Sequence, residues 1–509
     1  MVLMLCPGGG AWAADHHKDL GKRIDGILSR ADVARGFWGV EIEELETGRV
    51  LYSRDADRLY TPASNTKLFT TAAALALIGP EYRVHTTVES ATAPDKYGRL
   101  SGDLVLVGRG DPNLSGRTLP YNLKTERPLP PEQALAELAD QVVARGVKVI
   151  DGDIVADDSF FVYERYGEGW SQDDLVWEWG AAVSALAVND NVVYVNILPA
   201  EHVGERAFVS VSPFAEYFHL ENHVMTSPAG VWPRKIFVQR QPGSKHLEIW
   251  GNIPLNDTGA GEAVAIEDPA EFCARLLWEL LAKHGVTMFG KTRARHTALS
   301  SLDTITVNAS VPPGGGVDTQ GTTHPAVVLA EHVSAPLAMD IRVINKVSQN
   351  LHAEILLRLL GREKGNGGSI AGGLEVLRSF LTRADLRPEE IAFYDGSGLS
   401  RENLATPRAT VKLLRFAAQQ SWAADYMGSL PVAGVDGTLA GRLKNLPAGA
   451  TVQAKTGSLD HVNSLSGYLT TSKGERLVFS IMGNNHTLIN KNAAEVVDEI
   501  VREAERARN

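Results

Sequence analysis

Cysteine is nearly absent from this 509-residue chain, which contains only Cys6 and Cys273. Two cysteines cannot build a disulfide framework or a cysteine-based zinc site. Cys273 lies in the amphipathic stretch EFCARLLWELL, a setting that favours a small core residue over a reactive thiol. The motifs H-E-x-x-H and G-x-S-x-G are also missing, which weakens zinc-protease and α/β-hydrolase interpretations.

Positive charge is in deficit. The chain carries 50 Lys and Arg against 61 Asp and Glu, for a net charge of −11. Binding to the phosphate backbone requires clustered basic side chains. The charge balance therefore argues against nucleic acid as the main partner, and equally against broad adhesion to anionic lipid.

Long apolar runs are missing as well. No segment beyond the N-terminus offers the ~18 uninterrupted apolar residues of a membrane span. The N-terminus itself, MVLMLCPGGGAWAADHH, is a short apolar run that ends in Ala11-Trp12-Ala13, a small-x-small signal for leader cleavage. We expect residues 1–14 to be a signal peptide, and no transmembrane anchor after its cleavage. The positively charged start of a leader is lacking, so the alternative is a disordered apolar tail.

The chain contains two regions that differ in their pattern of expected strands and helices. The first ~75 residues and the last ~185 alternate strands with helices, among them a helix over 15–33 and a hairpin with its turn at 46–49. From about residue 88 short strands follow. Two amphipathic helices there, PEQALAELADQVVARG and DPAEFCARLLWELLAKHG, each lead into a strand, while from Pro325 the chain is expected to be helical. We expect a core domain split by a long insertion.

The stretch TPASNTKLFTTAAAL places Ser64 three residues before Lys67, at the start of an alanine-rich helix. Residues three apart lie on one helix face, so a neutral lysine amine there could remove the serine proton. A lysine can act as a base only if burial or a nearby cation lowers its pKa. The hypothesis therefore requires a second cation.

Two later stretches supply the missing parts. VSQNLHAE contains Ser348 and Asn350, a hydroxyl and an amide in a break between helical patterns. QAKTGSLD contains Lys455, the second cation, on an expected strand, and Gly457, whose missing side chain would let a substrate backbone lie against that strand.

In this order, S-x-x-K, S-x-N and K-T-G resemble the motif set of penicillin-binding proteins and β-lactamases. The span from Ser64 to Ser348 (348 − 64 = 284 residues) is far too long for a simple β-lactamase. The chain therefore resembles the D-alanyl-D-alanine carboxypeptidase/endopeptidase family of low-molecular-mass, class C penicillin-binding proteins with inserted domains. Further family-like stretches are GDLVLVGRGDPNL, GDIVADDSFF, AAVSALAVNDN and DGSGLSRENLATP.

The resemblance implies an α+β / α/β multidomain fold. Its β-lactamase-like (serine penicillin-recognising) transpeptidase core would be an antiparallel sheet flanked by helices and interrupted by a large insertion. The expected domains are a signal peptide (1–14), the catalytic core (15–88 and 325–509), inserted domain II (89–165 and 262–324) and a strand-rich inserted domain III (166–261).

The resemblance also implies roles for individual residues. Ser64 would be the nucleophile and Lys67 its base; Ser348 would relay a proton to the leaving amine, and Asn350 would hold the substrate amide and Lys67. Lys455 and Thr456 would bind the terminal carboxylate, next to Gly457. The backbone N–H groups of Ser64 and Ser458 would form the oxyanion hole. Asp157 would face a cationic substrate side chain.

Each assignment has a simpler alternative. Ser64 could only cap a helix, and Lys67 could be a solvated helix lysine. Ser348 and Asn350 could be capping residues between helices. Lys455 and Thr456 could lie on an exposed strand edge, and Asp157 could cap a turn.

The function expected from the resemblance is that of a serine DD-peptidase. It would remove the terminal D-alanine of peptidoglycan muropeptides, cleave D-Ala-containing cross-links, or both, through a Ser64 acyl-enzyme and without a metal or cofactor. β-Lactam antibiotics would act as inhibitors, and the location would be periplasmic or otherwise extracytoplasmic. The alternatives are a β-lactamase or esterase on the same scaffold and a penicillin-sensing or wall-binding protein without turnover. The sequence leaves the oligomeric state open.

Overall fold

The computed structural model describes residues 10–121, 127–230, 233–298, 315–317 and 323–507. It divides the chain into two compact units. Unit 1 contains residues 1–80, 341–353 and 376–509, and unit 2 contains residues 81–340 and 354–375.

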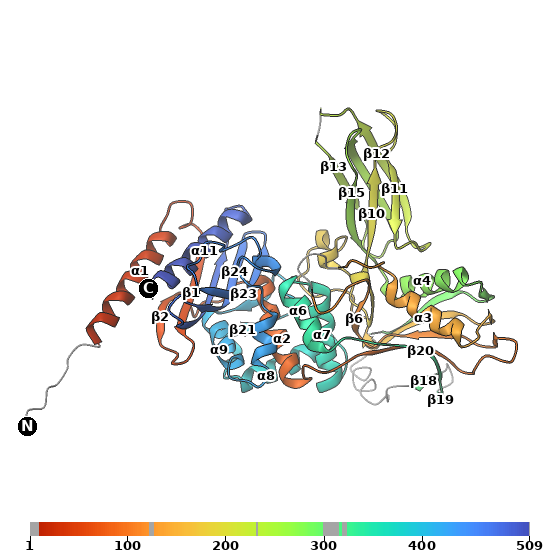
Figure 1. Cartoon of the computed structure of the whole chain (residues 1–509), viewed down its shortest axis with the longest axis horizontal. Coiled ribbons are helices and arrows are strands. Elements are labelled where there is room, and N and C mark those ends of the chain that lie inside the picture. Colours follow the sequence, from red (N-terminus) through yellow and green to blue (C-terminus); the bar gives the residue numbers. More distant parts are fainter. Residues whose placement is uncertain (1–9, 122–126, 231–232, 299–314, 318–322, 508–509) are drawn as a thin grey trace, which may run out of the picture. The chain divides into compact units, whose positions relative to one another are not determined.

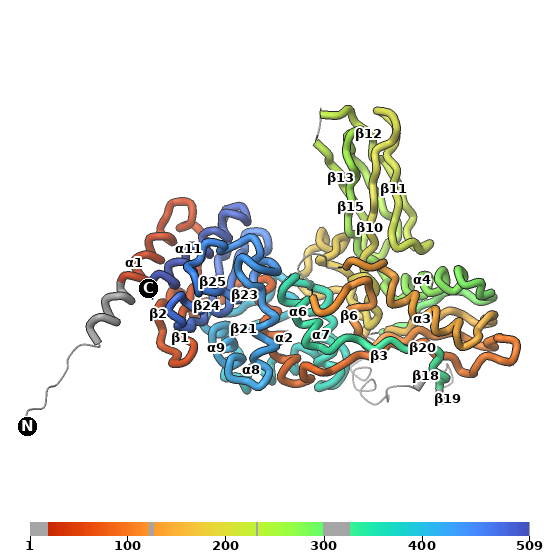
Figure 2. Tube along the Cα trace, viewed as in Figure 1, coloured from red at the N-terminus to blue at the C-terminus, as the bar shows by residue number. Residues whose placement is uncertain are grey.

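Unit 1 is built on one antiparallel sheet that joins the two ends of the chain. The strand order is β2-β1-β25-β24-β23, and Figure 2 shows the red N-terminal strands running beside the blue C-terminal ones. The expected hairpin turn is confirmed, with Gly48 at φ 71°, a backbone region that glycine enters without strain. The three expected C-terminal strands are confirmed too. The bounds are β1 Phe37–Glu44, β2 Val50–Arg54, β23 Thr451–Leu459, β24 Val462–Thr470 and β25 Arg476–Asn484.

Helices cover both faces of this sheet. α1 and α11 bury their apolar stripes against alternate residues of the strands, as the period of two in a strand dictates. On the other face α9 packs against β1 and β25. The helices of unit 1 are α1 Gly10–Leu28, α2 Thr66–Leu77, α9 Pro407–Ala417, α10 Ala423–Ser429 and α11 Asn490–Arg506.

Three helices contain residues assigned to both units, and two short strands belong to unit 1. The helices are α6 Leu337–Lys346, α7 Asn350–Lys364 and α8 Ile370–Arg383. The short strands are β21 Ile391–Ala392 and β22 Leu404–Ala405, which pair with each other.

Unit 2 contains the two amphipathic helices expected from the sequence, α3 Gln133–Ala144 and α4 Pro269–Lys283, and they pack against each other. Asp268 caps α4 by accepting a hydrogen bond from the backbone N–H of Glu271. The strands that follow the two helices pair with each other in parallel, β7 with β16 and β8 with β17. The strands of this layer are β3 His85–Ser90, β4 Arg99–Leu100, β5 Leu104–Val107, β7 Val149–Ile150, β8 Ile154–Val162, β16 Thr287–Met288, β17 Thr292–Thr297 and β20 Val327–Val333.

The expectation of helix directly after Pro325 was wrong. Residues 327–333 form strand β20, which pairs antiparallel with β3. The stretch VVLAEHV is rich in β-branched residues, which pack well on a pleated sheet. Helix begins only at Leu337.

The strand-rich stretch expected between the two helices is present and forms two small sheets, with orders β11-β10-β15 and β12-β14-β13. Figure 1 shows these long strands extending beyond α3 and α4, within unit 2. The bounds are β10 Val192–Leu198, β11 Phe208–Ser212, β12 His219–Ser227, β13 Lys235–Gln239, β14 His246–Pro254 and β15 Ala260–Ala265. The remaining strands are β6 Asp111–Leu114, β9 Leu186–Val188, β18 Gly315–Val317 and β19 Thr323–Pro325.

Some expectations fall on segments outside the described residues. Residues 1–9 of the expected signal peptide lie outside them, as do 299–314 and 318–322 of expected domain II. α1 begins at Gly10, five residues before the expected helix start. Within the part of the chain that the structure describes, no helix is both long and apolar enough to cross a membrane.

Candidate active site

Ser64 lies in a single 3-10 turn, Ala63–Asn65, that leads directly into α2. The residues at the two cap positions are Pro62 and Asn65, so Ser64 does not cap the helix and the capping alternative is wrong. The Lys67 Nζ donates to Ser64 Oγ at 2.9 Å, as the one-turn spacing predicts.

Lys67 is fully buried, which excludes the alternative of a solvated helix lysine. Besides Ser64, its Nζ donates to Asn350 Oδ1 and to the carbonyl oxygen of Ser397, both at 2.6 Å. Fixed acceptors on three separate segments therefore hold the amine next to the hydroxyl.

Ser348 occupies the turn between α6 and α7, with φ at 69°. A non-glycine residue in this left-handed region is strained, and such strain concentrates at functional sites. Lys455 Nζ donates to Ser348 Oγ at 2.8 Å and to the carbonyl oxygen of Thr456 at 2.9 Å. The structure therefore brings the second serine and the second lysine together.

Lys455 is completely buried although β23 is the outermost strand of its sheet, so the exposed-edge alternative is wrong for this residue. Burial lowers the pKa of Lys455 well below its ordinary value, and the positive charge of Lys67 lowers it further. The two amines therefore lie close enough to influence each other, as the sequence argument required.

Gly457 sits where β23 passes the segment that carries Ser64. A Cβ atom at this position would lie 2.2 Å from Ser464 Oγ, 2.6 Å from the carbonyl oxygen of Pro62 and 3.1 Å from the backbone nitrogen of Ser64. Any side chain would collide, so only glycine lets the strand approach the nucleophile this closely.

Thr456 and Ser458, on either side of Gly457, are held through their hydroxyl groups. Thr456 Oγ1 donates to Thr438 Oγ1 at 2.8 Å, and Ser458 Oγ accepts a hydrogen bond from Asn463 Nδ2 at 2.9 Å. Ser458 is exposed and Thr456 is half-buried, so both can meet a ligand.

Two contributors were missed by the sequence reasoning. The carbonyl oxygen of Ser397 binds Lys67, and Thr438 binds Thr456. Ser397 belongs to the stretch DGSGLS, in which the buried Asp395 accepts hydrogen bonds from the backbone N–H groups of Gly398 and Ser400. The stretch resembles the family, but the identity of a residue does not reveal what its backbone carbonyl oxygen will bind. Nothing in the sequence around Thr438 indicated that it belongs to the site.

Asp157 belongs to unit 2, on β8. Its carboxylate accepts a hydrogen bond from Arg295 Nη1 at 2.7 Å and one from the backbone N–H of Ser159 at 3.0 Å. Arg295 thus already balances its charge, and a cationic substrate group would have to compete with that arginine. The role expected for Asp157 stays a prediction.

The fold and the pairs Ser64–Lys67 and Ser348–Lys455 are typical of the penicillin-recognising serine enzymes. Comparison with known proteins narrows this class. The sequence matches the D-Ala-D-Ala carboxypeptidase 3 (S13) family over residues 20–313 and 312–506, and the chain belongs to that family.

Two curated relatives support the assignment to this family. A D-alanyl-D-alanine carboxypeptidase of an Actinomadura species is 34% identical over 480 residues, which is 92% of this chain and 81% of the relative. The D-alanyl-D-alanine carboxypeptidase DacB of Haemophilus influenzae is 26% identical over 444 residues, 87% of this chain and 84% of the relative. The chain is thus a serine-type D-Ala-D-Ala peptidase, a hydrolase, as the sequence predicted.

A solved structure supports the fold. The crystal structure of penicillin binding protein 4 from Haemophilus influenzae superposes with a TM-score of 0.75 at 23% identity, covering 95% of this chain and 98% of that one. The expected β-lactamase-like, multidomain α+β fold is confirmed.

Proposed function

We propose that Ser64 is the nucleophile of a two-step acyl transfer on peptidoglycan stem peptides. The observation that carries this proposal is the hydrogen bond of 2.9 Å between Lys67 Nζ and Ser64 Oγ, in a site where Lys67 is also bound by Asn350 and Ser397. A nucleophile within hydrogen-bond reach of a base that is itself oriented by a third group is the geometry that such catalysis needs.

In the first step, Lys67 in its neutral form takes the proton of Ser64 as the oxygen attacks the carbonyl of the penultimate D-alanine. The repulsion between the buried amines of Lys67 and Lys455 favours a state in which one of the pair has given up its proton. The backbone N–H groups of Ser64 and Ser458 would stabilise the negative oxygen of the tetrahedral intermediate.

Collapse of that intermediate breaks the peptide bond. Ser348 would pass its hydroxyl proton to the departing amine. Lys455, which donates a hydrogen bond to Ser348, could then supply a proton to replace it. Lys455 and Thr456 would hold the terminal carboxylate of the substrate. Water then hydrolyses the ester and frees Ser64.

The leaving amine decides the activity. If it is free D-alanine the enzyme is a carboxypeptidase, and if it belongs to a neighbouring stem peptide the enzyme is an endopeptidase. A solved structure of penicillin binding protein 4 from Haemophilus influenzae is described as a complex with a β-lactam. We propose that β-lactams bind this chain too and that they acylate Ser64. A peptidoglycan substrate lies outside the cytoplasm, and we propose a periplasmic location.

The test combines labelling with product analysis. A fluorescent penicillin should label the wild type and leave Ser64→Ala dark, and the exposed-lysine variant Lys444→Met should label normally. Incubation with pentapeptide and with cross-linked dimer should release D-alanine, monomer or both. Equal labelling of Ser64→Ala would remove Ser64 from the mechanism. Fast penicillin turnover without either product would favour the β-lactamase alternative, and acylation without any turnover the sensor.

A further inference from the structure

Unit 2 displays a group of ionisable side chains that the peptidase chemistry does not use. β12 and β14 run parallel, with Glu221 directly opposite Glu248 and His219 opposite His246. Because side chains alternate along a strand, His223 shares the face of Glu221 and lies two residues further on. Glu221 and His223 are exposed and Glu248 is half-buried, so the group faces solvent.

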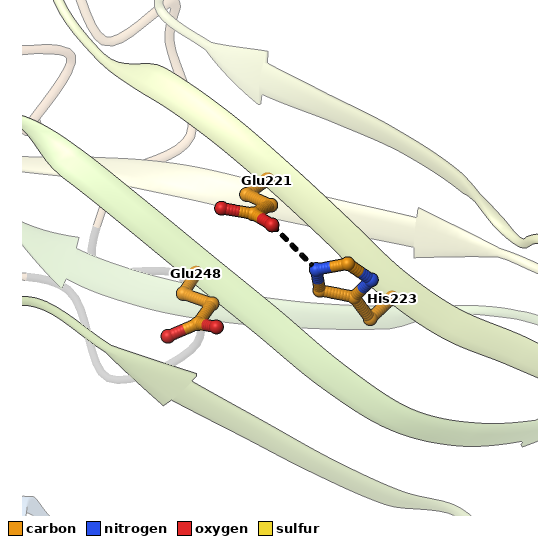
Figure 3. A group of neighbouring side chains, drawn as sticks. All are labelled: Glu221, His223 and Glu248. Carbon is orange, nitrogen blue, oxygen red and sulfur yellow. Dashed lines mark hydrogen bonds and ion pairs between the residues drawn. The ribbon is translucent and has the colours of Figure 1, made fainter.

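The potential ligand atoms of Glu221, His223 and Glu248 all lie within 4.8 Å of one another. Figure 3 shows the two carboxylates and the imidazole of the group on neighbouring strands, with the hydrogen bond between His223 and Glu221 drawn as a dashed line. His223 Nε2 lies 2.8 Å from one oxygen of Glu221, and His246 Nε2 lies 2.9 Å from the other. The imidazole of His246 therefore orients the Glu221 carboxylate.

Among the described residues, histidines but no lysine or arginine form ion pairs with the carboxylates of this group. Like charges directly opposite each other on neighbouring strands destabilise a sheet. In the described part of the chain, neither Glu221 nor Glu248 forms an ion pair with a lysine or arginine; the ionisable partners of Glu221 are the two histidines. A cation held between the two strands would remove the repulsion.

We propose that Glu221, His223 and Glu248 bind a divalent transition-metal cation, best matched by Zn²⁺. One imidazole and two carboxylates are ligands that zinc accepts, whereas Mg²⁺ and Ca²⁺ prefer sites made of oxygen alone. Three protein ligands leave a fourth position for water. Coordination would replace the proton shared between His223 and Glu221, and it would clamp β12 to β14.

The experiment is calorimetric titration of ZnCl₂ into the full chain, made without a histidine tag and dialysed against a chelator. We expect one site per chain. The His223→Ala variant should lose at least tenfold in affinity, and so should Glu248→Gln. His219→Ala is the matched control, because His219 lies on the same strand and face but outside the group, and it should bind like the wild type. Millimolar Mg²⁺ or Ca²⁺ should not compete.

Penicillin labelling of each variant checks that the chain still folds. A second readout is thermal unfolding, since a ligand that binds only the folded state stabilises it. Zn²⁺ should raise the melting temperature of the wild type and of His219→Ala but not that of His223→Ala. The proposal would be overturned if wild type and His223→Ala bound zinc with equal affinity. It would also be overturned if the wild type bound no zinc at about 100 µM metal.

Discussion

Two buried cations, Lys455 of unit 1 and Arg117 of unit 2, are held in different ways. In unit 1, Lys455 is fully buried and its Nζ donates to a hydroxyl and a carbonyl oxygen; within the described residues it forms no ion pair. In unit 2, Arg117 is equally buried but donates two hydrogen bonds to the carboxylate of Asp190, at 3.0 and 2.8 Å. The difference fits the chemical role proposed for Lys455 and a structural role for Arg117.

The physical reason lies in desolvation. Moving a charge out of water is costly, and a carboxylate partner offsets much of that cost while neutral acceptors offset less. An unbalanced buried amine therefore has a lowered pKa and gives up its proton more readily than an exposed amine, whereas a paired guanidinium keeps its proton. The pattern is specific to the site, because Lys346, also buried in unit 1, forms an ion pair with Asp436.

The largest effect is expected when the proposed base, Lys67, is removed. Lys67→Met keeps the length of the side chain but cannot take a proton, so the rate of acylation by penicillin should fall about a thousandfold. Stopped-flow acylation measures it, and the melting temperature should not fall. A near-native rate would show that Lys67 is not the base.

Replacing Arg117, the ion-paired cation of unit 2, should lower the stability of the protein and not the rate of acylation. Arg117→Met removes the guanidinium that pairs with the buried carboxylate of Asp190, so the free energy of unfolding should drop by about 3 kcal/mol, although Arg127 still lies 3.2 Å from that carboxylate. Denaturant unfolding measures the drop. Replacing Asp190 by asparagine as well should restore most of it, because asparagine removes the buried charge and tolerates the positive φ of 56° at this position. If the single variant is as stable as the wild type, the ion pair does not hold the fold.

His296 of unit 2 should make the free energy of unfolding depend on pH. Burial lowers the pKa of His296, but hydrogen bonds to Asp158 and Asp268 outweigh this and raise it to about 10. Because the folded-state pKa is raised, the stabilisation is complete below about pH 6.5, the unfolded value, and is lost as pH rises to about 10.

We expect the wild type to lose on the order of 2 kcal/mol more than His296→Gln between pH 7 and pH 10, after allowance for solvent screening. Unfolding curves of both proteins at several pH values measure this. Parallel pH profiles of the two proteins would contradict the assignment.

The smallest effect concerns Lys455 itself. Its folded-state pKa is lowered by burial and then by Lys67, so its charged form disfavours the folded state at neutral pH. Lys455→Met should therefore raise the free energy of unfolding by about 1 kcal/mol while it weakens turnover of carboxylate-bearing peptides. Denaturant unfolding and D-alanine release measure the two effects. A less stable variant would show that the neutral acceptors balance the charge after all.

Much of the site could be predicted from the sequence because most of its side chains lie in short motifs. The pair Ser64 and Lys67 needed only the geometry of one helical turn, and Gly457 needed only the rule that glycine marks a close approach. Ser397 could not be found in this way, because it contributes a backbone carbonyl that any residue type possesses. β20 was mistaken for helix because a short apolar run fits either structure until its pairing partner, β3, is known.

The local elements and the kinds of group available follow from the amino-acid sequence alone: two serines, two lysines, an amide and a glycine on segments of the right type. Only the tertiary structure decided that these segments meet, that Lys455 is buried on an edge strand, and that Asp157 is already engaged by Arg295. The reason is that hydrogen-bond periodicity acts within a few residues, whereas desolvation and Coulomb interaction depend on which distant segments pack together.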